Sequence, residues 1–148
     1  MPKTILLIDD EQGFLEALED ALVYEGYRVL KASTGEEALQ ILARESVDLA
    51  TLDVMFPPGP SLESKTSSHE TGLYLARVIT QLYPKLDLFC LSVVNDQNLI
   101  KEIQKLGVRF LRKGETPLIT VINMIRSRIT GIAYSTDREQ DKRKNFYD

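Results

Sequence analysis

Short apolar runs alternate with segments of helical periodicity along most of the chain, and this alternation restricts the fold more than any other feature. The first run, TILLI at residues 4–8, is wholly apolar and partly β-branched, which suits a strand covered on both faces. The predicted strands are residues 4–8, 28–32, 47–52, 86–94 and 108–111. Strands that alternate with helices predict an α/β fold, in which right-handed crossovers place helices on both faces of a parallel sheet.

Signals for helix ends support this assignment of elements. Gly26 and Gly107 each follow a segment of helical spacing, which is the usual position of a helix-terminating glycine. Thr34 precedes another such segment and is predicted to cap its first turn. Thr116 is predicted to cap the last helix, with Pro117 at its first position.

The remaining segments predict the limits of the domain. Residues 56–70 (FPPGPSLESKTSSHE) are rich in Pro, Ser and charge and predict a long loop, in which His69 is a solvated residue. Residues 134–148 predict a polar C-terminal tail. The length of 148 residues fits one domain, which we place at residues 1–133.

Composition excludes several classes of protein. The 18 basic and 22 acidic residues give a net charge of −4, which argues against direct nucleic-acid binding. A membrane span needs about 18 consecutive apolar residues, and no stretch approaches that length, so we expect no membrane contact and a cytoplasmic location. The single cysteine, Cys90, excludes an intrachain disulfide and lies in an apolar run where an inert thiol is expected.

Acidic, hydroxyl and basic side chains follow the predicted strands. They are Asp9, Asp10, Glu11, Asp53, Ser92 and Lys113. Ligands of such sheets bind beyond the carboxyl ends of the strands, so these side chains are expected to share one site. Grouped carboxylates repel one another, and Mg²⁺, which prefers oxygen ligands, relieves that repulsion. A lysine beside the metal completes a site for a phosphoryl group, and an aspartate is able to act as its acceptor.

These side chains belong to four short motifs, each at a predicted strand end. In chain order the motifs are ILLIDDE, LDVMFP, LSVVND and FLRKG. With them the chain resembles a two-component response regulator receiver domain of the CheY-like superfamily over about residues 4–131. The resemblance implies a doubly wound, five-stranded parallel sheet of order 2-1-3-4-5. It also implies a phosphoacceptor switch that takes a phosphoryl group from a phosphohistidine of a sensor histidine kinase or a histidine phosphotransfer protein.

The resemblance assigns a role to each site residue. Asp53 matches the phosphoacceptor. Asp9 and Asp10 match the acidic pair that holds Mg²⁺ together with Asp53 and the backbone carbonyl of Met55.

Three further residues match the parts that respond to the phosphoryl group. Ser92 matches the hydroxyl that bonds it, Lys113 the lysine that pairs with it, and Phe110 the aromatic side chain that swings inward, although ordinary core packing is the alternative for Phe110. The signal is expected to leave through the face of the fourth helix, fifth strand and fifth helix. The expected target of the signal is an unidentified downstream protein or a second copy of the chain in a homodimer.

The chain also departs from the family pattern. Gly114 stands where a cis proline is usual, and Val93 stands where a small residue is usual. These two departures keep open an alternative function, a receiver-like scaffold that does not use phosphate. The apolar side chains of Met55 and Val94 hold water poorly, which predicts slow self-dephosphorylation. We therefore expect self-phosphorylation and slow self-dephosphorylation in a signalling protein, rather than a metabolic enzyme.

Overall fold

A computed structural model describes residues 2–55, 58–64, 66 and 70–132 of the chain. The strands are β1 (Thr4–Ile8), β2 (Arg28–Ala32), β3 (Leu49–Leu52), β4 (Asp87–Ser92) and β5 (Arg109–Arg112). The helices are α1 (Gln12–Tyr24), α2 (Gly35–Arg44), α3 (Thr71–Leu82), α4 (Gln97–Lys105) and α5 (Leu118–Thr130), with a short 3₁₀ helix, η1 (Pro60–Leu62). The strands form one parallel sheet of order β2-β1-β3-β4-β5. This confirms the predicted fold class and strand order.

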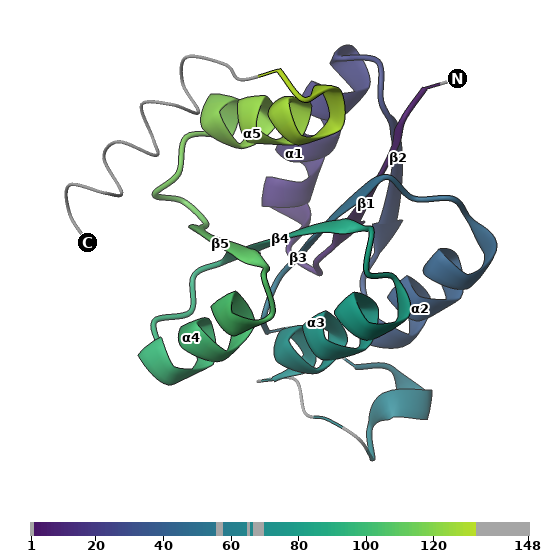
Figure 1. The fold of residues 1–148 in the computed structure, drawn as a ribbon, viewed down its shortest axis with the longest axis vertical. Helices are drawn as coiled ribbons and strands as arrows, with labels where there is room; N and C mark the ends of the chain where they lie inside the picture. The colour runs from purple at the N-terminus through teal and green to yellow at the C-terminus, as the bar shows by residue number, and fades with distance from the viewer. Residues whose placement is uncertain (1, 56–57, 65, 67–69, 133–148) are drawn as a thin grey trace.

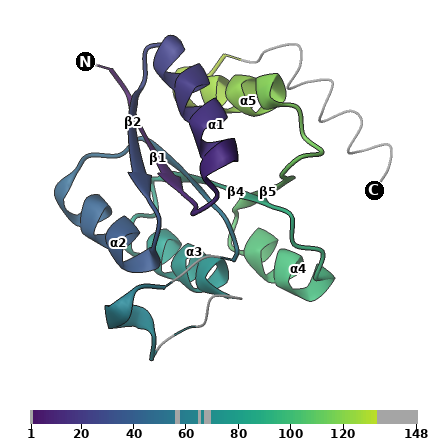
Figure 2. The ribbon, with the colours of Figure 1, turned by 180° about the vertical axis from the view of Figure 1, so that it is seen from behind.

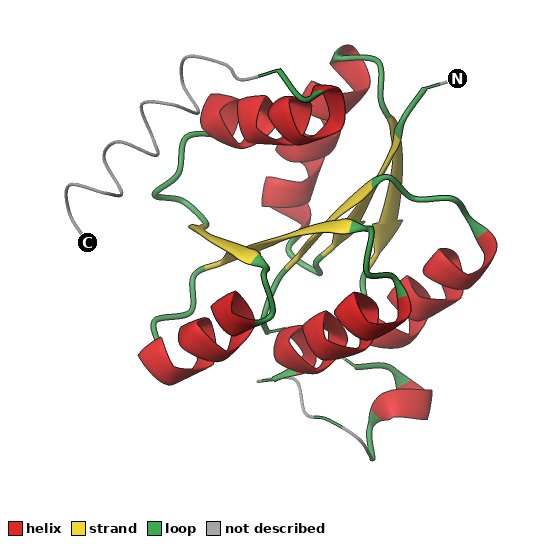
Figure 3. Ribbon diagram, viewed as in Figure 1, coloured by secondary structure: helices red, strands yellow, loops and turns green. Residues whose placement is uncertain are grey.

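Helices cover both faces of the sheet. Figures 1 and 2 show α1 and α5 on one face and α2, α3 and α4 on the other, and Figure 3 shows the strands as the layer between them. Alternate residues of each strand point to opposite faces, so β1 sends Ile5 and Leu7 toward α1 and α5, and Leu6 and Ile8 toward the other three helices. This two-sided burial explains why β1 and β3, in the middle of the sheet, are fully buried and almost wholly apolar, whereas β2 and β5 at its edges carry Arg and Lys.

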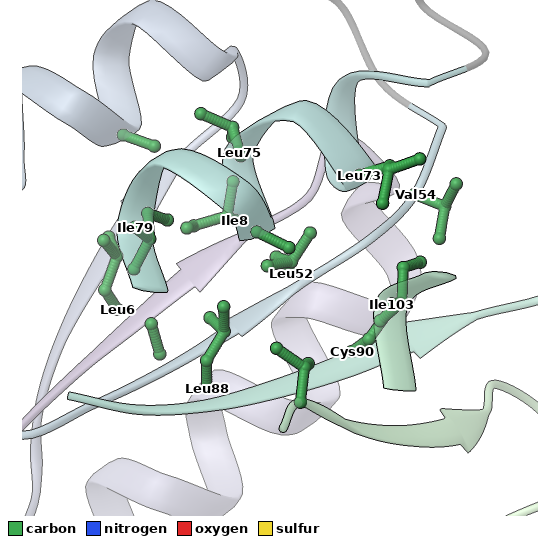
Figure 4. Packing of buried hydrophobic residues seen from close by; sticks show 14 of the residues in the cluster. Leu6, Ile8, Leu52, Val54, Leu73, Leu75, Ile79, Leu88, Cys90 and Ile103 are labelled. Atoms are coloured by element: carbon green, nitrogen blue, oxygen red, sulfur yellow. The ribbon is translucent and has the colours of Figure 1, made fainter. Parts of the chain in front are cut away.

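The core between the sheet and α2, α3 and α4 is drawn close up in Figure 4, where residues from the strands and α3 interdigitate. Cys90 is fully buried in this cluster. Burial, with the negative charges of Asp53 and Asp9, raises the pKa of its thiol, which stays uncharged at neutral pH. Cys90 is therefore a packing residue, as predicted.

The helix ends confirm two of the predicted caps and correct a third. The Thr34 hydroxyl accepts a hydrogen bond from Glu37 N–H at 3.1 Å. Gly26, at φ +95°, ends α1 and donates to the carbonyl of Val23. The predicted cap by Thr116 is wrong: Pro117 has an extended ψ of 144° and is itself the N-cap, because its carbonyl accepts the first bonds of α5.

Two strands are shorter than predicted, for local reasons. β4 ends at Ser92, because Val94 N–H turns back to the Ser92 hydroxyl instead of joining the sheet. β3 begins at Leu49, two residues later than predicted, and Asp48 before it uses its side chain to accept from Thr4 N–H at 2.8 Å. Among the described residues, no helix is long and apolar enough to cross a bilayer.

The described part of the predicted 56–70 loop is folded against the N-terminus of α2. Leu62 of η1 is buried, and the carbonyl of Pro58 accepts from Glu36 N–H at 2.8 Å. The Glu36 carboxylate in turn accepts from Ser61 N–H at 3.3 Å. Residues 56–57, 65 and 67–69, with His69, and the predicted tail at 134–148 lie outside the described residues. The domain limits stay a prediction.

Gly72 fixes how the chain returns from this loop to α3. Its N–H donates to the carbonyl of Val54 at 2.8 Å, and a Cβ at this position would collide with backbone atoms of Asp53 and Val54. Backbone atoms cannot move aside as the end of a flexible side chain can. The first turn of α3 is therefore held directly against the end of β3.

We predict that Gly72→Ala lowers the free energy of unfolding by about 1–3 kcal/mol, the usual cost of overpacking. Gly13→Ala is the matched control, because a Cβ at this glycine of α1 meets nothing within 4 Å. That variant is expected to leave stability unchanged or raise it by up to about 1 kcal/mol. Denaturant unfolding of both variants tests this, and equal effects would contradict the close packing at Gly72.

Candidate functional site

The carboxyl ends of β1, β3 and β5 carry the central residues of the site. The backbone N–H groups of Asp9, Asp53 and Lys113 each donate at 3.0 Å to the last carbonyl of the neighbouring strand, β2, β1 and β4 respectively. The sheet's hydrogen bonding thus continues one residue past the strands. The positions of these three side chains are therefore set by the hydrogen bonding of the sheet.

Lys113 lies at the centre of a group of carboxylates. Its Nζ is 2.5 Å from an oxygen of Asp9, 2.9 Å from Glu11 and 3.3 Å from Asp53. It also lies 5.0 Å from the centre of the Phe14 ring. The side chain of Lys113 is only 4% exposed, those of Asp9 and Asp53 are 7% and 11% exposed, and that of Glu11 is 58% exposed. Three of the four charged groups are therefore largely removed from water.

Burial shifts the protonation equilibria of this group. It raises the pKa of Asp9, although the hydrogen bond from Lys113 partly opposes the shift. Burial alone would lower the pKa of Lys113, but the bonds to Asp9 and Glu11 and the charge of Asp53 outweigh it and raise that pKa. Lys113 is therefore a permanent cation at physiological pH.

Backbone donors orient the two buried carboxylates. The second oxygen of Asp9 accepts from Glu11 N–H at 2.9 Å, and that of Asp53 accepts from Val54 N–H at 2.7 Å. Each carboxylate thus turns one oxygen to the backbone and the other to Lys113. The oxygens facing Lys113 are chemically able to bind a cation, and a carboxylate oxygen such as that of Asp53 can also attack an electrophile.

Asp10 lies apart from this group and is exposed. With Asp9 it lines a cavity of about 330 Å³ between α1 and the start of α2, where Glu16, Lys31 and Glu37 also contribute. Among the described residues, no three acidic, histidine or cysteine side chains are grouped at metal-binding distances. The predicted ligand set of Asp9, Asp10, Asp53 and the Met55 carbonyl stays a prediction.

The chemistry of the site nevertheless fits Mg²⁺. Asp9 and Asp53 supply buried oxygen ligands that share one ammonium ion between them. Mg²⁺ in proteins is usually bound by one or two carboxylates together with water and phosphate oxygens. A bound Mg²⁺ would therefore neutralise part of the negative charge of Asp9 and Asp53, which Lys113 alone cannot neutralise fully.

Ser92, the last residue of β4, lies next to this group, because its carbonyl accepts from Lys113 N–H at 3.0 Å. Ser92 is buried, and its hydroxyl accepts from Val94 N–H at 3.3 Å. Met55 and Val93 are 43% and 64% exposed, so the bulk of Val93 affects the approach from solvent rather than the buried carboxylates. Val94 packs against the hydrophobic cluster on the α2–α4 face.

Phe110 is buried in the same cluster, with 9% of its surface exposed. Its neighbours there include Cys90, Ile103 and Val108. An aromatic that is to swing inward has to start outside the core, and Phe110 is already inside it. The position fits the core-packing alternative, and the switch role stays a prediction.

Gly114 adopts φ +86°, and no cis peptide bond occurs among the described residues. A proline is restricted to φ near −65° and could not adopt this turn. Glycine, which lacks a Cβ, adopts this positive φ without strain.

Three residues around the site make contacts that the sequence does not predict. Glu11 is one of the acids that follow β1, but its ion pair with Lys113 depends on the turn into α1. Phe14, in the first turn of α1, lies with its ring 5.0 Å from the same ammonium. Arg112 donates to the side chain of Asn95 at 2.7 Å and to the carbonyl of Val94 at 3.4 Å, which attaches the β4–α4 loop to β5. Only the tertiary arrangement reveals these contacts.

We predict that Asp9→Asn raises the free energy of unfolding in metal-free buffer near neutral pH. The folded protein binds the Asp9 proton more tightly than the unfolded chain, so the charged form costs stability above the folded-state pKa. The gain should therefore shrink as the pH falls through that value, and vanish below 3.8. Asp20→Asn, at an exposed position of α1, is the control. A gain that does not change with pH would contradict this account.

Comparison with known structures identifies the fold. A CheY-like response regulator receiver domain protein from Methanospirillum hungatei superposes with a TM-score of 0.75, covering 94% of this chain and 99% of that one at 20% identity. The BeF₃-activated DrrB receiver domain superposes with a TM-score of 0.70, covering 88% of this chain and 99% of that one, also at 20% identity.

Comparison of sequences identifies the family. Response regulator GtcR of Aneurinibacillus migulanus is 34% identical over 122 residues, which cover 82% of this chain and 46% of GtcR. Response regulator MprA of Mycolicibacterium vanbaalenii is 39% identical over 72 residues, or 49% of this chain and 31% of MprA. The chain thus spans less than half the length of these relatives. The family model of the response regulator receiver domain matches residues 5–123. The chain therefore belongs to the response regulator receiver domain family.

Proposed function

We propose that this receiver domain is a phosphoacceptor switch and that Asp53 is its acceptor. The observation that carries the proposal is the buried Asp53 carboxylate, which has the Lys113 ammonium 3.3 Å away at the carboxyl edge of the sheet. A nucleophile and a permanent cation at this distance suit attack on a phosphorus atom, because the cation stabilises charge on the transferred group.

The phosphodonor in this proposal is a phosphohistidine of a sensor histidine kinase or a histidine phosphotransfer protein. A carboxylate oxygen of Asp53 attacks phosphorus, the bond between phosphorus and the histidine nitrogen breaks, and the imidazole leaves with that bond's electron pair. Asp53 then carries an aspartyl phosphate. The response-regulator relatives support such a partner.

Magnesium belongs to the same proposal. Asp9, Asp10, Asp53 and the Met55 carbonyl would hold it, and when bound it would neutralise charge on the phosphoryl oxygens. Asp10 is exposed and so has to turn toward Asp9 and Asp53 to contribute. Lys113 and the Ser92 hydroxyl would bond the transferred phosphoryl group.

The output surface is proposed to be the α4-β5-α5 face. Arg112 of β5 is bonded to the β4–α4 loop, so a movement of Ser92 toward a phosphoryl group would reach α4 through this loop. A downstream protein or a second copy of the chain would recognise the changed α4-β5-α5 face. The cytoplasmic location stays a prediction from the sequence.

A scaffold that does not use phosphate is the second candidate. The turn at Gly114 is the observation that favours it, since this turn departs from the family pattern next to Lys113. The intact group of Asp9, Asp53 and Lys113 favours the switch, because a scaffold has no need of buried charges that are costly to desolvate.

We predict that Asp53→Asn abolishes phosphorylation by a phosphohistidine donor. Asparagine keeps the size of the side chain but lacks the nucleophilic oxygen. The measurement is the mass increase of one phosphoryl group on the intact protein in Mg²⁺. Asp20→Asn, on the exposed side of α1, should be labelled like the native protein.

Two outcomes would separate the candidate functions. Labelling that persists in Asp53→Asn would place the acceptor elsewhere. If neither a phosphohistidine donor nor beryllofluoride modifies or binds the native protein, the scaffold is the correct function.

We predict that the aspartyl phosphate decays slowly. Hydrolysis needs a water in line with the phosphoryl group, and the apolar side chains of Met55 and Val94 offer it no hydrogen bond. Met55→Asn with Val94→Glu should therefore shorten the lifetime. Dephosphorylation is followed as loss of the phosphoryl mass with time in Mg²⁺.

Met55→Leu with Val94→Ile is the matched control, since it keeps both positions apolar. It should decay at the native rate. A native protein that already decays as fast as the polar double variant would contradict this explanation of the lifetime.

A further inference from the structure

We propose that Glu11 and Phe14 are positioning residues that hold the Lys113 ammonium on the α1 side of the site and so oppose its movement toward a phosphoryl group on Asp53. This inference rests on the proposed function and adds to it two residues that set the strength of the phosphoryl contact.

The distances show where the ammonium is held. Lys113 Nζ lies closer to Asp9, at 2.5 Å, and to Glu11, at 2.9 Å, than to Asp53, at 3.3 Å. Asp9 and Asp53 are both buried at strand ends, whereas Glu11 approaches from the turn that leads into α1. Glu11 is thus a third anion that competes with Asp53 for one cation.

The Glu11 side chain has no role in capping α1. Glu11 is the N-cap residue of α1, but its side chain makes no capping hydrogen bond. Its backbone carbonyl accepts from Leu15 N–H at 3.2 Å, a bond that substitution of the side chain leaves in place. Glu11→Gln therefore removes the charge that faces Lys113 without removing a cap.

Phe14, in the first turn of α1, is the second residue that holds the Lys113 ammonium. The ammonium lies 5.0 Å from the centre of its ring, within the range of a cation–π interaction. Phe14 also packs against the core between the sheet and α1 and α5, which limits its movement. The ring and the Glu11 carboxylate thus contact the ammonium from one helix.

A phosphoryl group on Asp53 would change the balance of charges. It brings about −1.5 to −2 charge and three acceptor oxygens to the Asp53 side of Lys113. To bond these oxygens fully, the ammonium has to give up part of its contact with Glu11 and Phe14. These two residues therefore weaken the bound state of a phosphoryl group relative to a chain that lacks them.

The first test needs neither metal nor phosphate. The hydrogens of the Lys113 ammonium are followed by nitrogen-15 NMR of the full chain in metal-free buffer, since hydrogen-bonded ammonium groups exchange slowly with water. Glu11→Gln should speed this exchange by about two- to fivefold, the range for loss of a partly exposed ion pair. Phe14→Leu, which keeps an apolar side chain, should also speed it.

Glu16→Gln is the control, because it removes the same charge from an exposed position of the same helix. Among the described residues, Glu16 takes part in no ion pair with Lys113. Exchange in Glu11→Gln that matches Glu16→Gln, or fast exchange already in the native protein, would overturn the inference.

The second test measures the consequence for the site with beryllofluoride as the phosphoryl mimic in Mg²⁺. Glu11→Gln should bind it about two- to fivefold more tightly than Asp20→Asn does, since Asp20 is an exposed acid of the same helix that does not line the cavity of Asp9 and Asp10. In a Lys113→Ala background this difference should disappear, because the effect acts through the ammonium. A difference that persists without Lys113 would show that Glu11 acts only through its general charge.

The two tests separate this inference from the proposed function. If the native protein binds no beryllofluoride, the proposed function fails while the exchange measurement still decides whether Glu11 and Phe14 hold Lys113. If beryllofluoride binds but Glu11→Gln and Asp20→Asn bind it equally, the function stands and the positioning role is wrong.

Discussion

The burial of one ammonium ion among carboxylates at the edge of the sheet is the constraint on which the rest of the site depends. Lys113 is 4% exposed and bonds Asp9 and Asp53, which are themselves nearly buried. Charges removed from water are tolerated only when they are paired and hydrogen-bonded. Each carboxylate meets this condition with one oxygen on a backbone N–H and the other on Lys113.

The parallel sheet makes this arrangement possible. Its two hydrophobic clusters hold the strands from both faces, and the hydrogen bonds between strands continue through the first residue after β1, β3 and β5. The cost of desolvating the charges is thus offset by apolar burial elsewhere in the domain. The pairing leaves an excess of negative charge, because three carboxylates surround one ammonium, and this excess suits the site to a divalent cation.

Adaptations particular to this chain lie around that centre rather than in it. The segment between β3 and α3 is folded against α2 through Pro58 and Glu36, and Gly72 brings the chain back onto the Asp53 backbone. Gly114 takes a turn that proline could not take. Glu11 and Phe14 approach Lys113 from α1. These features lie on loops and helix ends, whereas Asp9, Asp53 and Lys113 are held by the hydrogen bonds of the sheet.

The sequence by itself determined the order of elements, the two-sided core and the collection of acids and lysine at one edge. These follow from local periodicity and from the rule that parallel strands end at the same edge, as at Asp9 and Asp53. The prediction of Thr116 as the N-cap of the last helix is wrong, because the start of the helix is set by the backbone angles of Pro117, which the sequence does not reveal. Only the tertiary structure decided that Phe110 lies inside the core and that Glu11 and Phe14 contact Lys113. Such contacts join residues about a hundred positions apart in the chain, and no local pattern encodes them because they arise from packing α1 against the end of β5.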